Sequence, residues 1–105
     1  MTPTQRSLKY LRDKGYTVEV VERSTNFGGR FRRHDLFGIA DLIALGDNEV
    51  LLVQVTSASN VSARVKKITE SEHLNAIRKA NVGIIVHGWG KKSNGRYEVR
   101  EVDLS

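Results

Sequence analysis

The most apolar part of the chain lies between residues 39 and 56 and contains two apolar runs, 39–45 and 49–56. Between them stands a short Gly-Asp-Asn sequence, which is typical of a tight turn. Two apolar runs joined in this way predict an antiparallel hairpin. A tight turn would place Leu45 opposite Val50, and this register determines which side chains of the two strands face each other.

Three polar side chains interrupt these apolar strands on one face. The expected register places Asp41 opposite Gln54, and directly opposed residues have Cβ atoms roughly 4.5–5.5 Å apart. Thr56 shares the face of Gln54 because side chains alternate along a strand. A carboxylate in a buried strand is costly unless it is paired, hydrogen-bonded or holding a metal. Asp41, Gln54 and Thr56 are therefore the first candidates for a functional site.

The rest of the chain predicts helices and further strands around this hairpin. Thr2 and Gln5 can form a capping box, and Gly15 is a typical stop, so a helix is expected between them. Apolar residues at helical spacing predict helix over 61–80, with a break near Ile68. Strands are expected at 17–22, 82–87 and 96–102, and a mobile basic loop, or a frayed extension of the flanking strands, at 24–34.

These elements follow the order α-β-β-β-α-β-β. That order predicts one α/β (α+β) domain over 1–105, with a mixed central sheet flanked by helices. The absence of cysteine excludes disulfides and thiolate chemistry. No apolar run approaches the roughly 20 residues that span a bilayer, and the polar N-terminus does not resemble a signal peptide. We therefore expect a cytoplasmic protein with no membrane contact.

The charge of the chain favours a polyanionic partner. Its 17 Lys and Arg exceed its 12 Asp and Glu, which gives a formal net charge of +5. Many small proteins are basic without binding nucleic acid, but here the basic residues are clustered. The candidate nucleic-acid contacts are Arg23, Arg30, Arg32, Arg33, His34, Arg64, Lys66 and Lys67.

The arginines of the 24–34 segment stand next to Phe27 and Phe31. Arginines in this arrangement could bind a phosphate backbone while the aromatic rings stack on bases. The alternative is a solvated loop with Phe31 packed into the core.

Three segments carry a resemblance to a known family. They are 11–16 (LRDKGY), 39–45 (IADLIAL) and 52–57 (LVQVTS). With the element order, they resemble the PD-(D/E)XK nuclease superfamily, and within it the archaeal-type and phage Holliday junction resolvases. The second segment stands where the superfamily has its Pro-Asp motif, and the third where it has Glu-x-Lys.

The resemblance implies a restriction-endonuclease-like αβββαββ core and a metal-dependent endonuclease of branched DNA, acting in DNA recombination. It implies Mg²⁺ or Mn²⁺ as cofactor, a homodimer with an interface near Trp89 and the last hairpin, and a host cytoplasm if the protein is phage-encoded. Asp41 matches the metal-binding aspartate of the superfamily. The further expected ligands are Gln54, the Val55 carbonyl and Asp35, with Glu22 as another replacement carboxylate.

One of the four signature residues of the superfamily is intact, and two of the departures remove charge that its chemistry uses. Gln54 stands in place of a glutamate and Thr56 in place of a lysine, and the first helix lacks its usual glutamate. Lys66 or Lys67 would have to supply the catalytic cation of an endodeoxyribonuclease. The alternative is therefore a catalytically degenerate nuclease-fold protein that only binds DNA. A structural partner within a larger nucleoprotein assembly is a third hypothesis.

Overall fold

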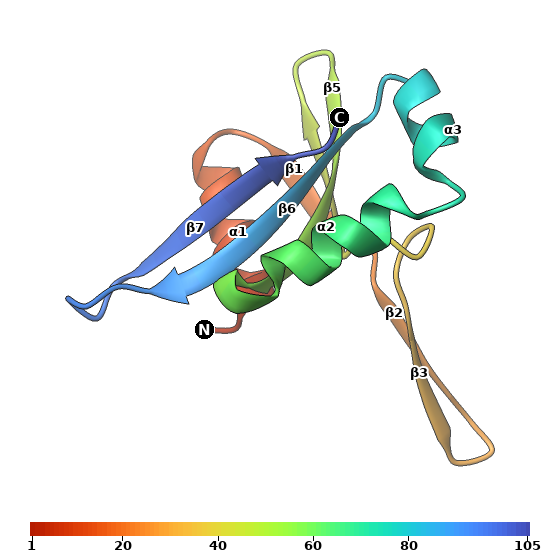
Figure 1. Ribbon diagram of the computed structural model, residues 1–105, viewed down its shortest axis with the longest axis horizontal. Coiled ribbons are helices and arrows are strands. Elements are labelled where there is room, and N and C mark those ends of the chain that lie inside the picture. The colour runs from red at the N-terminus through yellow and green to blue at the C-terminus, as the bar shows by residue number, and fades with distance from the viewer.

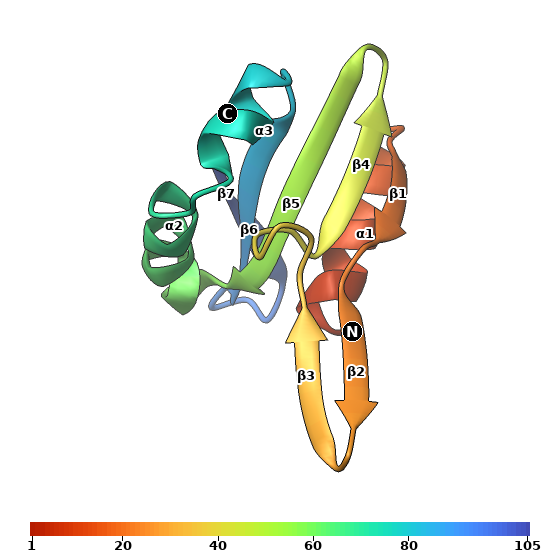
Figure 2. The same ribbon diagram turned by 90° about the vertical axis from the view of Figure 1, so that its right-hand side faces the viewer.

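A computed structural model describes all 105 residues (Figures 1 and 2). Its elements are, in chain order, α1 (Pro3–Asp13), β1 (Thr17–Val20), β2 (Arg23–Phe27), β3 (Arg30–His34), β4 (Leu42–Gly46), β5 (Glu49–Ser57), the 3₁₀ turn η1 (Ala58–Asn60), α2 (Val61–Thr69), α3 (Leu74–Lys79), β6 (Gly83–Lys91) and β7 (Tyr97–Asp103). Five strands form one mixed sheet in the order β1-β4-β5-β6-β7, in which only β5 and β6 are parallel. β2 and β3 form a separate two-stranded sheet.

Helices cover both faces of the five-stranded sheet, with α1 on one side and α2 and α3 on the other (Figure 2). Because side chains alternate along a strand, β5 directs Leu52 toward α2 and α3 and Val53 toward α1. Leu52 packs in a core cluster with Ile68, and Val53 packs in a second cluster with Leu11. The expected mixed sheet flanked by helices is confirmed.

The helix boundaries follow the signals in the sequence. The Gln5 backbone N–H donates to Thr2 Oγ1 over 3.1 Å and the Thr2 backbone N–H donates to Gln5 Oε1 over 2.9 Å, so the predicted capping box is present. The predicted helix over 61–80 is broken, because α2 ends at Thr69 and α3 begins at Leu74. None of the helices is both long and apolar enough to cross a membrane.

The hairpin of β4 and β5 has the predicted register. Leu45 pairs with Val50 and Leu42 with Val53, so the next residues along the two strands are Asp41 and Gln54. The Asp41 backbone N–H donates to the Val53 carbonyl over 2.9 Å, which holds residue 41 against β5 beyond the last ladder pair. The backbone therefore brings the two polar side chains together at the end of β4.

Residues 24–34 differ from the expected loop. β2 and β3 pair along their whole length, from Arg23 opposite His34 to Phe27 opposite Arg30, and project away from the main sheet (Figure 2). Gly28 and Gly29, both with positive φ, form the two-residue turn, a conformation that a type I′ turn requires. All ten strand residues are exposed. The sequence therefore lacks the alternation of apolar and polar residues that predicts a half-buried strand.

Candidate nucleic-acid interface

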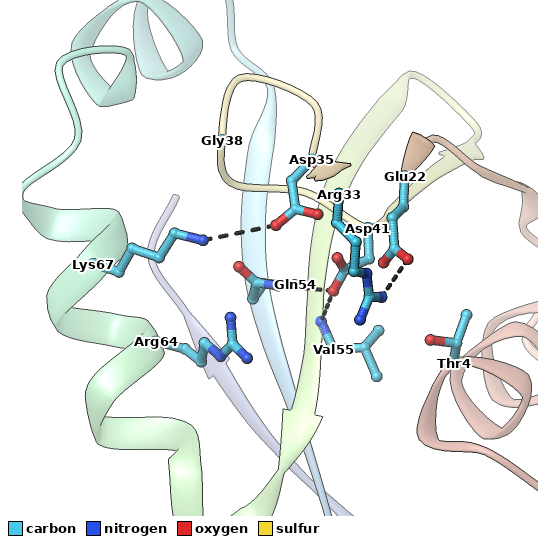
Figure 3. A pocket seen from close by; sticks show the side chains of 10 residues that line it. All are labelled: Thr4, Glu22, Arg33, Asp35, Gly38, Asp41, Gln54, Val55, Arg64 and Lys67. Atoms are coloured by element: carbon cyan, nitrogen blue, oxygen red, sulfur yellow. Dashed lines mark hydrogen bonds and ion pairs between the residues drawn. The ribbon is translucent and has the colours of Figure 1, made fainter. Parts of the chain in front are cut away.

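A cleft of about 380 Å³ opens at the base of the β2–β3 hairpin, between α1, β5 and α2 (Figure 3). Polar side chains dominate its walls. Strand β5 contributes its floor, α1 and α2 contribute opposite sides, and the segments that enter and leave the hairpin contribute the rest. The lining residues are Thr4, Glu22, Arg33, Asp35, Gly38, Asp41, Gln54, Val55, Arg64 and Lys67.

Asp41 lies at the centre of this cleft and is 5% exposed. Its Oδ2 accepts two hydrogen bonds of 2.7 Å, one from Gln54 Nε2 and one from the Val55 backbone N–H. The predicted Asp41–Gln54 contact is thus present. Thr56 is also buried in β5 but does not line the cleft.

Two further carboxylates lie beside Asp41. One oxygen each of Glu22, Asp35 and Asp41 can be chosen so that all three lie within 4.8 Å of one another. The outer carboxylates have cationic partners, since Glu22 pairs with Arg33 and Asp35 Oδ2 lies 3.7 Å from Lys67 Nζ. Cations therefore balance the charges of Glu22 and Asp35, whereas the buried Asp41 forms no ion pair.

The environment of Asp41 strongly favours the protonated carboxyl. Burial, together with the neighbouring charge of Asp35, raises the pKa of Asp41 from 3.8 to about 7. The hydrogen bonds from Val55 and Gln54 act in the opposite direction, because they stabilise the charged form. The cost of removing the charged carboxylate from water is larger than the effect of these two hydrogen bonds, so the pKa of Asp41 is raised.

The side-chain oxygen of Gln54 has no hydrogen-bond partner. Gln54 is 1% exposed, and its amide nitrogen is committed to Asp41. Its Oε1 is buried without a donor. A buried carbonyl oxygen without a donor loses the hydrogen bonds that it made to water.

The basic residues of α2 divide into two groups. Arg64 and Lys67, three residues apart and therefore on one face of the helix, line the cleft. Lys66 is exposed and lies outside the cleft lining. Of the two lysines suggested by the sequence, Lys67 is the one in the cleft.

The basic residues of the hairpin lie mainly outside the cleft. Directly opposed residues share a face, so the ladder places Arg23, Phe27, Arg30, Arg32 and His34 on one face. The opposite face carries Phe31 and Arg33, and the latter turns back to Glu22 in the cleft.

Both phenylalanines of the hairpin are exposed. Phe27 is 90% exposed and Phe31 is 66% exposed. The alternative in which Phe31 packs into the core is therefore wrong. Exposed aromatic rings that are flanked by arginines form a surface suited to stacking with bases.

Trp89, which the sequence suggested for a dimer interface, packs within the chain. It is half-buried, its Nε1 donates to Ser7 Oγ over 2.8 Å, and its ring meets Tyr10 edge-on. The neighbouring His87 is fully buried, with Nδ1 3.0 Å from Ser7 Oγ, and burial lowers its pKa. These side chains join β6 to α1, and nothing at Trp89 supports the expected homodimer.

Two lining residues were missed by sequence reasoning. Thr4 enters the cleft from the first turn of α1, and Gly38 from the loop between β3 and β4. Gly38 has φ +67, a backbone conformation that favours glycine. Gly38 was a local sequence signal of a tight turn at this point, and the structure also places Phe37 at positive φ.

The family described as the anticodon binding domain matches residues 3–80, which is most of the sequence. No curated protein and no solved structure matches.

This match overturns the resemblance to PD-(D/E)XK nucleases and Holliday junction resolvases. An endonuclease of branched DNA is therefore wrong as the function, and the DNA-binding protein with a degenerate nuclease fold is unsupported. The element order misled because mixed sheets flanked by helices serve many unrelated functions. Of the four signature residues only Asp41 was present, and an aspartate there is equally explained by its hydrogen bonds to Gln54 and Val55. The chain belongs to the anticodon binding domain family.

Proposed function

We propose that this domain binds RNA and recognises an unpaired loop, with the anticodon loop of a transfer RNA as its target. The single observation that carries the proposal is the projecting β2–β3 hairpin, with its exposed phenylalanines among arginines. Membership of the anticodon binding domain family supports RNA as the partner. The domain would then act in a protein that selects tRNA, as aminoacyl-tRNA synthetases do.

The charge on the hairpin supports contact with a phosphate backbone. Arg23, Arg30, Arg32 and His34 share one exposed face, and no carboxylate stands on that face. Each phosphate neutralised by a cation releases counterions, so affinity should fall steeply with salt. These residues would position the RNA without reading its sequence.

The aromatic rings support a single-stranded target. Phe27 and Phe31 stand on opposite faces near the tip of the hairpin, where a ring can reach a base only if that base is unpaired. Base stacking on an aromatic side chain contributes roughly 1–3 kcal/mol per base. Paired bases in an A-form helix do not offer their faces to such rings.

The cleft at the base of the hairpin extends this surface toward α2. Arg64 and Lys67 face the cleft from α2, and Arg33 faces it from β3 (Figure 3). Arg64 forms no ion pair within the chain, which leaves its guanidinium available to a phosphate. A strand of RNA that leaves the hairpin tip would meet these cations next.

The test is binding of a fluorescent anticodon stem-loop RNA, measured by anisotropy. The competitors are an RNA of the same composition without unpaired nucleotides and a duplex DNA of the same length. The stem-loop should bind at least tenfold more tightly than either. Equal affinity for all three would reduce the interaction to nonspecific charge attraction and contradict the proposal.

A matched pair of variants separates the hairpin from net charge. Arg30→Ala with Arg32→Ala removes two charges from the hairpin, and Lys79→Ala with Arg96→Ala removes two exposed charges from α3 and the β6–β7 turn. The first pair should weaken stem-loop binding tenfold or more, and the second should change it less than twofold. Equal loss in both pairs would exclude the hairpin as the binding surface.

A further inference from the structure

The buried end of the cleft gathers three carboxylates, and only the outer two, Glu22 and Asp35, have cationic partners. Glu22, Asp35 and Asp41 each place a carboxylate oxygen within 4.8 Å of the others. Asp41 accepts the hydrogen bonds from Gln54 and Val55 through Oδ2, so neither of these donors occupies Oδ1. When all three are ionised, carboxylates this close repel one another, and a cation between them would remove that repulsion.

The neutral side-chain amide of Gln54 provides a second observation that points to a bound cation. Gln54 donates its amide nitrogen to Asp41, and this hydrogen bond fixes the orientation of the amide. Its Oε1 is then buried, without a donor, in the wall of the cleft beside the acidic cluster (Figure 3). No side chain of the protein satisfies this oxygen, whereas a metal ion could accept its lone pair.

We propose that Glu22, Asp35, Asp41 and Gln54 Oε1 form a binding site for one divalent cation, Mg²⁺ or Mn²⁺. Carboxylate and amide oxygens are the hard ligands that these ions prefer, with waters completing the octahedron. Thiolate and imidazole donors are absent from the cleft lining, which disfavours zinc.

The Val55 carbonyl stays a predicted ligand, and the backbone N–H of Val55 has a separate role. This N–H, a hydrogen-bond donor, faces Asp41. It holds the Asp41 carboxylate in place, as Gln54 Nε2 does. Both donors act on one oxygen, so the other remains directed toward the cation.

The cation would compete with two basic side chains for the carboxylates of Glu22 and Asp35. Arg33 pairs with Glu22, and Lys67 lies 3.7 Å from Asp35. The Arg33 side chain is 61% exposed and that of Lys67 is 47% exposed, so both can move into solvent when an ion enters. The site rests on these contacts alone and does not depend on RNA binding.

The test uses MnCl₂ as probe, with isothermal titration calorimetry and the electron paramagnetic resonance of free Mn²⁺ as readouts. The wild-type chain should bind one equivalent saturably. Asp35→Asn and Glu22→Gln, which alter partly exposed side chains without changing their size, should each weaken binding at least tenfold. Glu70→Gln removes an exposed carboxylate of the helix C-cap and should leave binding unchanged.

Thermal unfolding provides an independent readout, because a ligand that binds only the folded chain raises its melting temperature. Mn²⁺ should raise the melting temperature of the wild type and of Glu70→Gln, but not that of Asp35→Asn. Absence of saturable binding, or equal binding by the wild type and Asp35→Asn, would overturn the proposal. Either result would leave the RNA-binding proposal standing, since that is tested without a divalent ion.

Discussion

Replacing Asp41 by asparagine should stabilise the metal-free protein at alkaline pH. The asparagine oxygen can still accept from Gln54 Nε2 and the Val55 N–H, while its new amide group can donate to Glu22 or Asp35. The variant keeps the hydrogen bonds of the wild type and removes a buried charge.

The magnitude follows from the shift of the Asp41 pKa. The folded-state pKa, about 7, lies above the unfolded value of 3.8, so the folded chain holds this proton more tightly. The stability that the proton contributes is present below pH 4 and is lost as the pH rises to 7. A difference of about three pKa units corresponds to about 4 kcal/mol.

The assay is urea unfolding followed by Trp89 fluorescence, with a chelator present, across this pH interval. The free energies of unfolding of Asp41→Asn and the wild type should converge near the acid end. At the alkaline end the variant should be more stable by about 4 kcal/mol. Asp47→Asn, in the exposed β4–β5 turn, should show no such pH-dependent difference. A variant less stable than the wild type at alkaline pH would refute the reasoning, because the ionised carboxylate would then be required by the fold.

Three further predictions concern the hairpin, the cleft and the first helix. Phe27→Ala should weaken stem-loop binding by about 1–3 kcal/mol in anisotropy titrations, whereas Phe27→Tyr should preserve it; equal loss in both would exclude stacking. Arg33→Ala should act in opposite directions in two assays, tightening Mn²⁺ binding in calorimetry because Glu22 is released, and weakening RNA binding; parallel changes would contradict the assigned roles. Thr2→Ala should lower the free energy of unfolding by about 1 kcal/mol in urea titrations, and Thr2→Ser should restore it, because the capping box requires a hydroxyl.

Local signals accounted for much of the fold. The Gly-Asp-Asn turn set the register of Leu45 and Val50, and this register brought Asp41 to Gln54. A capping box depends on residues three apart, so the start of α1 could be read from the sequence. These features follow from short-range stereochemistry, which one sequence contains.

The acidic cluster could be predicted only in part. Glu22 and Asp35 directly flank the β2–β3 hairpin, and because its ends are paired the two residues meet at its base. A segment taken for a loop gives no reason to bring its ends together. The exposed strands of this hairpin have no buried face, and their pairing was therefore not visible in the hydrophobic pattern.

The family could not be predicted from the site. An aspartate opposite a glutamine in a hairpin is consistent with nuclease chemistry, with a metal site and with a purely structural hydrogen bond. The order of helices and strands did not separate these possibilities, because many proteins with different functions share one architecture. The match over residues 3–80 identified the family, which the residues around Asp41 could not do.

The β2–β3 hairpin and the adjoining face of α2 are proposed to bind an unpaired RNA loop. The most direct measurement is the change of backbone amide NMR shifts when an anticodon stem-loop RNA is added to the ¹⁵N-labelled protein. The largest changes should fall on residues 23–34 and on the α2 positions near Arg64 and Lys67, while β7 stays unchanged. Changes centred on β7, or none on the hairpin at saturating RNA, would contradict the claim.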